Sequence, residues 1–422
     1  MIETTQLTPG VTLRYCRDSR FKKGAISIQL LRPMNEQENA LNALLPAVLL
    51  RGTAFHPDLR SITEHLDDLY GASIGTMVRR IGDIQTVGFY LSFMEDRFAL
   101  AGDKILEPMA AFLEETMLHP LLENGVFPEH FVDSEKKNLI STIESELNDK
   151  RTYTGARMFR QMCQGDSFAV PRLGTVEGVQ NITPESLYVH YLHILMHSPV
   201  EIFYVGSAER TEVARLLTPL ARSIARAPEA LPEQTIFTPQ TCAGEFSEEM
   251  DVAQAKLSMG FTSTVNNQSG DFAAMQVFNA IYGAGMTSKL FLNVRERLSL
   301  CYYANSAYYG SKGIVTVSCG IDEENYGRAK EEILAQLRDC QEGKISDGEL
   351  EAGKKAILSS LRATPDSPGS LEGFYATASI SGLNWTLEEY MERVRAVTAA
   401  DVARAAATVK PHTAFLLKGV GK

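Results

Sequence analysis

The alternation of apolar and polar residues along the chain predicts a mixture of strands and helices. Residues 25–31, AISIQLL, alternate in the way typical of a strand. Leu290, Val294 and Leu298 recur at helical spacing and share one face of a predicted helix over residues 288–298. The same criteria predict strands at residues 11–14, 72–78, 85–93, 200–206, 255–263, 302–309, 314–321 and 413–419, and helices at residues 35–50, 61–69, 100–117, 128–147, 272–282, 328–343, 346–361 and 399–408.

Capping residues mark several of the predicted helix ends. Thr183 followed by Pro184 is a favourable helix start, because threonine accepts a hydrogen bond from the first turn and proline fits the first helical position. Ser61 and Glu64 have the spacing of a capping box, so we expect the second helix to begin at Ser61. Gly52 suits the left-handed residue that follows the first helix.

The order of predicted elements repeats in the second half of the chain. KKNLIS at residues 136–141 matches KKAILS at residues 354–359, an offset of 218 residues. Residues 182–206 match residues 397–421 without gaps, at an offset of 215 residues. Two such matches in the same order rarely arise by chance. We therefore predict two homologous α+β domains, each an antiparallel sheet with helices on one face.

A change of composition separates the two halves. Residues 227–249 are rich in proline, glutamate and threonine and have weak periodicity, so we interpret them as a linker. The first domain then covers residues 1–226 and the second covers residues 250–422. A chain of 422 residues is also too long for one ordinary domain.

Composition excludes some classes of function. A net charge of −11 argues against nucleic-acid binding, which needs a basic surface. No signal peptide is visible at the N-terminus, and the apolar runs are far shorter than the ~20 residues of a membrane helix. The six cysteines have no C-x-x-C spacing, which predicts reduced, mostly buried thiols. We expect a soluble cytoplasmic protein that binds neither nucleic acid nor membrane.

The stretch LFLNVRERLSLCYY at residues 290–303 contains the main candidate for chemistry. Arg295 lies near the end of the predicted helix, and Tyr302 begins the strand that follows. A guanidinium and a phenol placed in this way can converge on one peptide carbonyl. They would then stabilise the negative charge of a tetrahedral intermediate. A structural salt bridge is the alternative explanation for Arg295.

The same stretch resembles the insulinase-like M16 metallopeptidase family, in which two homologous halves enclose a peptide chamber as a clamshell. The family's second half carries an Arg–Tyr pair in the pattern L-F-x-x-x-R-E-x-x-x-L-x-Y, which falls here on Arg295 and Tyr302. Glu296 and Leu300 also match. The segment SLCYY is most similar to a bacterial branch of the family named for its association with modification of elongation factor P.

The resemblance also implies a zinc motif, H-x-x-E-H, on the helix before a Gly-Thr turn. Two histidines one turn apart bind zinc, and the glutamate activates water. Alignment on the turn at residues 51–53 puts Ala43, Pro46 and Ala47 at those positions. Neither imidazole nor the carboxylate is present. We therefore expect this chain to bind no metal there and to hydrolyse no peptide on its own.

A further glutamate ligand is implied on a later helix of the first half. The resemblance places it seven residues after Glu135, at Thr142, which lacks a carboxylate. Glu144 and Glu146 are close enough in sequence to leave this alignment open.

Three other groups of residues have patterns that could serve a function. His190, His193 and His197 could face one metal, but no carboxylate shares their face, and a favourable interaction with the helix C-terminus is the simpler explanation. The glycine-rich run at residues 283–285 lacks phosphate-loop spacing and is interpreted as a flexible turn. A peptide groove could be lined by three tyrosines, Tyr303, Tyr308 and Tyr309. Aromatic strand residues are, however, more often core or pairing residues.

The leading hypothesis is the zinc-less subunit of a heterodimeric M16-type peptidase. The chain would bind the peptide, in extended form along a sheet edge, and contribute Arg295 and Tyr302. The homologous partner would carry H-x-x-E-H and the zinc. A non-catalytic peptide-binding or scaffold protein with the same fold is the alternative. An autonomous enzyme that uses another metal site is a third possibility.

Overall fold

The computed structural model describes residues 2–420, which form two compact units. The division between Glu233 and Gln234 falls inside the predicted linker. Each unit also contains a segment from the opposite half of the sequence. Unit 1 consists of Met1–Glu144, Val170–Glu233 and Pro365–Thr377, and unit 2 consists of Ser145–Ala169, Gln234–Thr364 and Ala378–Lys422.

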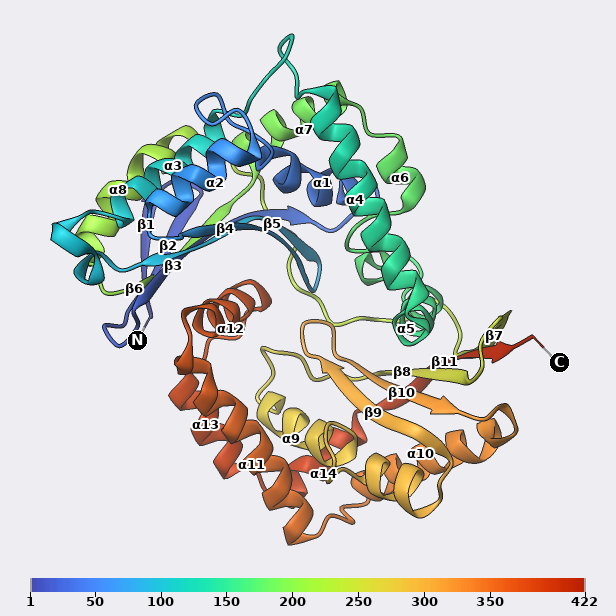
Figure 1. Cartoon of the computed structure of the whole chain (residues 1–422). Helices are drawn as coiled ribbons and strands as arrows, with labels where there is room; N and C mark the ends of the chain where they lie inside the picture. The colour runs from blue at the N-terminus through green and yellow to red at the C-terminus, as the bar shows by residue number, and fades with distance from the viewer. Residues whose placement is uncertain (1, 421–422) are drawn as a thin grey trace. The chain divides into compact units, whose positions relative to one another are not determined.

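A six-stranded mixed sheet lies at the centre of unit 1 (Figure 1). Its strands are β1 (Ile2–Thr8), β2 (Val11–Arg17), β3 (Lys23–Pro33), β4 (Ser73–Ile81), β5 (Ile84–Met94) and β6 (Val200–Gly206). They follow the order β1-β2-β6-β3-β5-β4. The pair β2–β6 is parallel and the other neighbours are antiparallel.

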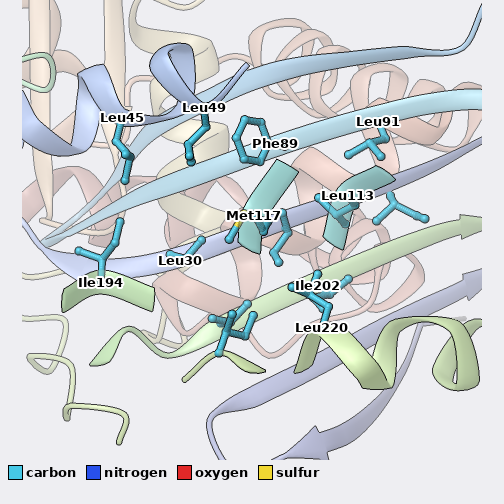
Figure 2. Packing of buried hydrophobic residues seen from close by; sticks show 14 of the residues in the cluster. Leu30, Leu45, Leu49, Phe89, Leu91, Leu113, Met117, Ile194, Ile202 and Leu220 are labelled. Carbon is cyan, nitrogen blue, oxygen red and sulfur yellow. The ribbon is translucent and has the colours of Figure 1, made fainter. Parts of the chain in front are cut away.

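Helices cover one face of this sheet, and their apolar sides form the core of unit 1 (Figure 2). Leu45 and Leu49 pack from the first helix, Phe89 from β5, and Leu113 and Leu220 from two further helices, all at most 3% exposed. The helices of unit 1 are α1 (Asn39–Leu49), α2 (Leu59–Asp68), α3 (Leu106–Leu118), α4 (Glu129–Asn148, mostly in this unit), α6 (Val176–Gln180), α7 (Pro184–His197) and α8 (Arg210–Ser223).

The other face of the same sheet holds a buried carboxylate. Glu372, on α12 (Pro368–Ser381), is 2% exposed. Its carboxylate accepts hydrogen bonds from Ser27 Oγ at 2.9 Å and Gln29 Nε2 at 3.0 Å, both on β3. Arg79, on β4, donates to it through Nη1 at 3.0 Å and Nη2 at 2.8 Å. These contacts attach a segment from the second half of the sequence to the sheet of unit 1.

A five-stranded mixed sheet lies at the centre of unit 2. Its strands are β7 (Gly244–Met250), β8 (Ala255–Thr262), β9 (Cys301–Tyr309), β10 (Ile314–Ile321) and β11 (Lys410–Gly419). They follow the order β7-β11-β8-β10-β9, and β7 and β11 are parallel. The α+β prediction is confirmed, but each sheet contains one parallel pair because strands distant in sequence lie side by side. The end of the predicted linker is part of β7.

The helices of unit 2 include one from the first half of the sequence, α5 (Lys150–Met162), which packs on β8 and β11. The approach is close, because a Cβ on Gly260 of β8 would lie 2.4 Å from Met162 Sδ and 2.6 Å from Met158 Sδ. The others are α9 (Phe272–Tyr282), the π-helix η4 (Leu290–Arg297), α10 (Tyr326–Gln341), α11 (Asp347–Ala363), α13 (Leu387–Ala396) and α14 (Ala399–Ala407).

The repeat seen in the sequence has a structural counterpart. α4 and α11 begin at Glu129 and Asp347, which are 218 residues apart. Lys136 of α4 donates to the carbonyl of Gln180 at the end of α6, and Lys354 of α11 donates to the carbonyl of Arg395 near the end of α13. The two lysines therefore make the same contact in the two units. The last repeat position, Gly421, lies outside the described residues.

Some predicted boundaries differ from the structure. The helix predicted to begin at Ser61 begins at Leu59, because Asp58 is the N-cap and accepts a hydrogen bond from the Ser61 amide at 2.8 Å. The Ser61 hydroxyl completes that capping box. The helix predicted from residue 100 begins at Leu106, after two short 3₁₀ turns. Thr183 caps α7 as predicted.

Candidate functional site

The π-helix η4 holds the first candidate residue. Leu290 and Val294 are buried and anchor it to unit 2. Its last turn is wide, because the Leu298 amide donates to the Asn293 carbonyl, five residues earlier, at 3.2 Å. Ser299 then adopts a left-handed conformation with φ of 49°. Wide turns of this kind are frequent at functional sites, and here the turn redirects the chain into β9.

Arg295 is held at the surface by its own helix. Its guanidinium carbon lies 4.7 Å from the centre of the Phe291 ring, and Nε lies 3.4 Å from Glu296 Oε1. The side chain is 41% exposed. A cation–π contact and an exposed ion pair are each weak, so the guanidinium is oriented while much of its surface still faces solvent.

Tyr302 lies on β9, an edge strand of the unit 2 sheet. The pairing with β10 matches Tyr303 to Gly320 and Cys301 to Ile321, which are consecutive on β10. Tyr302 is therefore the extra residue at an irregularity of β9. Such bulges change the direction of a side chain. The Tyr302 side chain is 63% exposed.

Arg295 and Tyr302 line the same surface depression, which has a volume of about 410 Å³. An arginine, a tyrosine and two acidic residues therefore border one open space. A guanidinium and a phenol can both donate hydrogen bonds to an oxygen atom, so the arrangement is suited to binding a carbonyl or a carboxylate. The other residues that line the depression are Glu296, Ser299, Leu300, Cys301 and Asp322.

The helix that would carry the zinc motif has no metal-binding side chains at the three expected positions. Ala43 is 8% exposed, Pro46 is buried inside α1, and Ala47 is half-buried. None has a donor atom in its side chain, so these residues do not fit a zinc ion. Ala43 is part of the hydrophobic core of unit 1. Within residues 2–420, no group of three or more His, Cys, Asp or Glu side chains is arranged to hold a metal ion.

Thr142, at the position expected for the further glutamate ligand, makes a hydrogen bond within its own helix. The Thr142 hydroxyl donates to the Asn138 carbonyl of its own helix at 2.9 Å. Glu135 pairs with Arg51 at 3.4 Å. These contacts are directed to the backbone and to a neighbouring cation rather than to a common centre.

The three histidines of α7 do not face one common centre, although the His193 and His197 rings lie 4.7 Å apart and each approaches Glu229 Oε1 at 4.0 Å. His190 is buried and its Nε2 lies 2.7 Å from Asn42 Oδ1, and burial lowers its pKa to about 4. His193 contacts the Arg32 guanidinium at 3.2 Å. His197 is the last residue of the helix, and its Nδ1 lies 3.0 Å from the Ala227 carbonyl.

The glycine run and the tyrosines of β9 are packed more tightly than their sequence indicated. A Cβ on Gly283 would lie 2.6 Å from the Ser306 amide nitrogen, and that amide donates to the Gly283 carbonyl at 3.1 Å. This first glycine is therefore fixed against the edge of β9 rather than being part of a flexible turn. The Tyr308 hydroxyl donates to the Val265 carbonyl at 2.8 Å, and Tyr309 packs on Phe159. Tyr308 and Tyr309 have structural roles.

Comparisons with known proteins agree with these observations. The family description "Peptidase M16 inactive domain" matches residues 181–357. A Bacillus subtilis protein named probable inactive metalloprotease YmfF is 28% identical over 97% of this chain and 96% of its own length. The chain is therefore similar to M16 peptidases in sequence over residues 181–357 and to an M16 relative over nearly its whole length. Both the matching family description and the name of this relative contain the word inactive, and α1 of this chain lacks zinc-binding side chains at the three expected positions.

Solved structures show the same fold as this chain. A conserved protein from Enterococcus faecalis V583 superimposes with a TM-score of 0.92 at 27% identity, over 100% of this chain and 99% of that one. An M16 inactive domain from Pseudomonas fluorescens gives a TM-score of 0.82 at 16% identity, over 100% and 98%. In the described part of the chain, no helix is long and apolar enough to cross a membrane.

Proposed function

We propose that this chain is the zinc-less subunit of a heterodimeric M16 peptidase and contributes Arg295 and Tyr302 to hydrolysis. The observation that carries the proposal is their common position on one open depression, in a chain whose α1 has no metal ligands. A residue pair retained for the chain's own stability would be expected to be more buried and more fully bonded. Tyr302 is instead mostly exposed.

In the proposed reaction, the peptide carbonyl next to the bond to be broken lies in the depression. Arg295 and the Tyr302 hydroxyl donate hydrogen bonds to its oxygen as negative charge develops, which lowers the barrier to attack. The partner would supply zinc and the general base that activates water. The carboxylate of Glu296 keeps the Arg295 side chain close to the surface of η4 until substrate replaces that contact.

The edge strand β9 would bind the peptide by strand addition. Its free edge is limited, because the Ser306 amide is already bonded to the Gly283 carbonyl. Strand addition is therefore expected near the start of β9, beside Tyr302. An extended peptide would then lie at the depression rather than along the whole strand.

The test is reconstitution with a homologous chain of similar length that carries H-x-x-E-H. The mixture should cleave a fluorogenic peptide faster than the partner alone. Replacing Tyr302 with phenylalanine, or Arg295 with alanine, should reduce kcat/KM by about 10²-fold, the usual effect of removing one oxyanion donor. Arg297→Ala is the matched control, because Arg297 lies on the same helix and is paired with Glu332 outside the depression.

A binding or scaffold role without catalysis gives a different pattern. In that case Tyr302→Phe would leave the rate of the mixture unchanged, and only peptide affinity would respond to Arg295→Ala. Equal rates for the wild-type mixture and the partner alone would refute a catalytic contribution. Elemental analysis of the purified chain tests the third possibility, an autonomous metal site.

A further inference from the structure

Two cysteines lie side by side at the edge of the candidate site. Cys301 is the first residue of β9, and Cys319 lies on the neighbouring strand β10. Cys301 is paired with Ile321, two residues beyond Cys319, so both cysteine side chains project from the same face of the sheet. The two thiols are close enough for each to shift the pKa of the other, lowering that of Cys301 and raising that of Cys319.

Access from solvent differs between the two thiols. Cys301 lines the depression with Arg295 and Tyr302, and it is 8% exposed. Cys319 is fully buried. A small reagent that enters the depression therefore reaches Cys301 first, and Cys319 can react only with the Cys301 sulfur, once that sulfur is part of a mixed disulfide.

The electrostatic surroundings favour the same order of reaction. A side-chain hydrogen bond with Cys319 and, to a smaller extent, the positive charge of Arg295 lower the pKa of Cys301, although burial opposes them. The pKa of Cys319 is raised well above its usual value by that hydrogen bond and by burial. Burial also raises the pKa of the distant Cys340, to about 12. Cys301 thus has more thiolate character than these buried thiols.

We propose that Cys301 and Cys319 form a thiol pair that low-molecular-weight disulfides oxidise to an intramolecular disulfide. The Cys301 thiolate attacks the reagent RSSR, forms a mixed disulfide and releases RS⁻. The Cys319 thiolate then attacks the Cys301 sulfur, forms the Cys301–Cys319 bond and releases a second RS⁻. Two protein thiols are oxidised, one RSSR is reduced to two RSH, and the protons of the two thiols end on the released thiols.

Closure of this disulfide requires movement at the start of β9. Cysteines staggered by two residues on adjacent strands have more widely spaced Cα atoms than directly opposed ones. A disulfide needs a short Cα separation, so Cys301 must move toward β10. The irregular pairing at Tyr302 and the left-handed Ser299 are the places where the backbone can adjust. Because Tyr302 moves with Cys301, oxidation also changes the candidate site, a consequence that rests on the proposed function.

The test uses the full chain with Cys242→Ser, which removes the exposed cysteine. Incubation with oxidised glutathione should give a protein lighter by two hydrogen atoms. Trypsin should release residues 298–312 and 313–328 as one disulfide-linked pair, because each contains one of the two cysteines. Cys319→Ser should instead trap one glutathione on Cys301, and Cys301→Ser should stay unmodified. Dithiothreitol should reverse both modifications.

Two outcomes would overturn the proposal. One is stable glutathione on Cys301 in the chain that retains Cys319. The other is no reaction of the folded chain at concentrations that modify Cys242 in the unsubstituted protein. Neither outcome depends on peptidase activity, so failure of the proposed function would not be mistaken for failure of the thiol pair. Where reconstitution succeeds, oxidation should lower the rate of the mixture, and Cys301→Ser should abolish that sensitivity.

Discussion

Replacing Glu372 with alanine removes the acceptor for four hydrogen bonds inside unit 1. Ser27 and Gln29 are fully buried, and each would lose a partner for a donor group. Arg79, whose side chain is 32% exposed, would lose its ion pair. Breaking a buried ion pair on one side typically costs about 3–5 kcal/mol, because the remaining partner stays desolvated.

The size of the effect should follow the number of bonds that each variant loses. We expect Glu372→Ala to lower the free energy of unfolding by about 3–5 kcal/mol. Glu372→Gln keeps the shape and one carbonyl acceptor but loses the charge, so a loss of about 1–3 kcal/mol is expected. In the double variant with Arg79→Met, the loss should be smaller than the sum of the single losses, because neither partner is left unpaired.

Urea unfolding followed by circular dichroism measures these differences. Glu331→Ala is the control, because Glu331 is an exposed glutamate in a helix interior and its removal should change stability by less than about 0.5 kcal/mol. If Glu372→Ala were no more destabilising than Glu331→Ala, the contacts of α12 with the unit 1 sheet would contribute nothing to stability. The reasoning from the buried carboxylate would then be refuted.

Three further predictions concern stability, each measured by urea unfolding. Gly283→Ala should cost about 1–3 kcal/mol because its Cβ would clash with Ser306, whereas Gly285→Ala enters open space and should be close to neutral. Lys136→Met and Lys354→Met should each cost about 0.5–1.5 kcal/mol, the net contribution of a typical hydrogen bond, and the exposed neighbours Lys137 and Lys355 serve as controls. The folded-state pKa of His190, about 4, lies below its ordinary 6.5, so the unfolded chain binds the proton first. About 3 kcal/mol of stability should therefore be lost as pH falls through that window. His190→Gln should remove this part of the pH dependence, and an unchanged pH profile would contradict the assignment.

Local signals in the sequence account for much of the fold. The helix at Phe272–Tyr282 was predicted with its observed bounds, because its sequence FAAMQVFNAIY is rich in residues that favour a helix, although it is buried on nearly all sides. The capping of α7 by Thr183 was also visible, since cap chemistry depends only on neighbouring residues. Asp58 was missed because Ser61 and Glu64 offered a competing capping pattern.

Contacts between residues distant in sequence could not be predicted in the same way. The helices α5 and α12 were missed because α5 is strongly polar and α12 has little amphipathic character, and each is stabilised by packing on a sheet from the other half of the sequence. The parallel pairs β2–β6 and β7–β11 depend on such packing as well.

The candidate site was predicted only in part. The resemblance to M16 peptidases selected Arg295 and Tyr302, and the missing zinc ligands were visible at Ala43, Pro46 and Ala47. The irregular pairing that exposes Tyr302 depends on the register with β10, which no local pattern specifies. The contact between Cys301 and Cys319 depends on that same register, so the spacing of the cysteines gave no signal for it.

The most direct measurement of the central claim is the rate of peptide cleavage by a partner carrying H-x-x-E-H, with and without this chain. The proposed role predicts a higher kcat/KM in the mixture, a loss of most of that gain with Tyr302→Phe, and no loss with Arg297→Ala. A Tyr302→Phe mixture as fast as the wild-type mixture would contradict a catalytic contribution from the phenol.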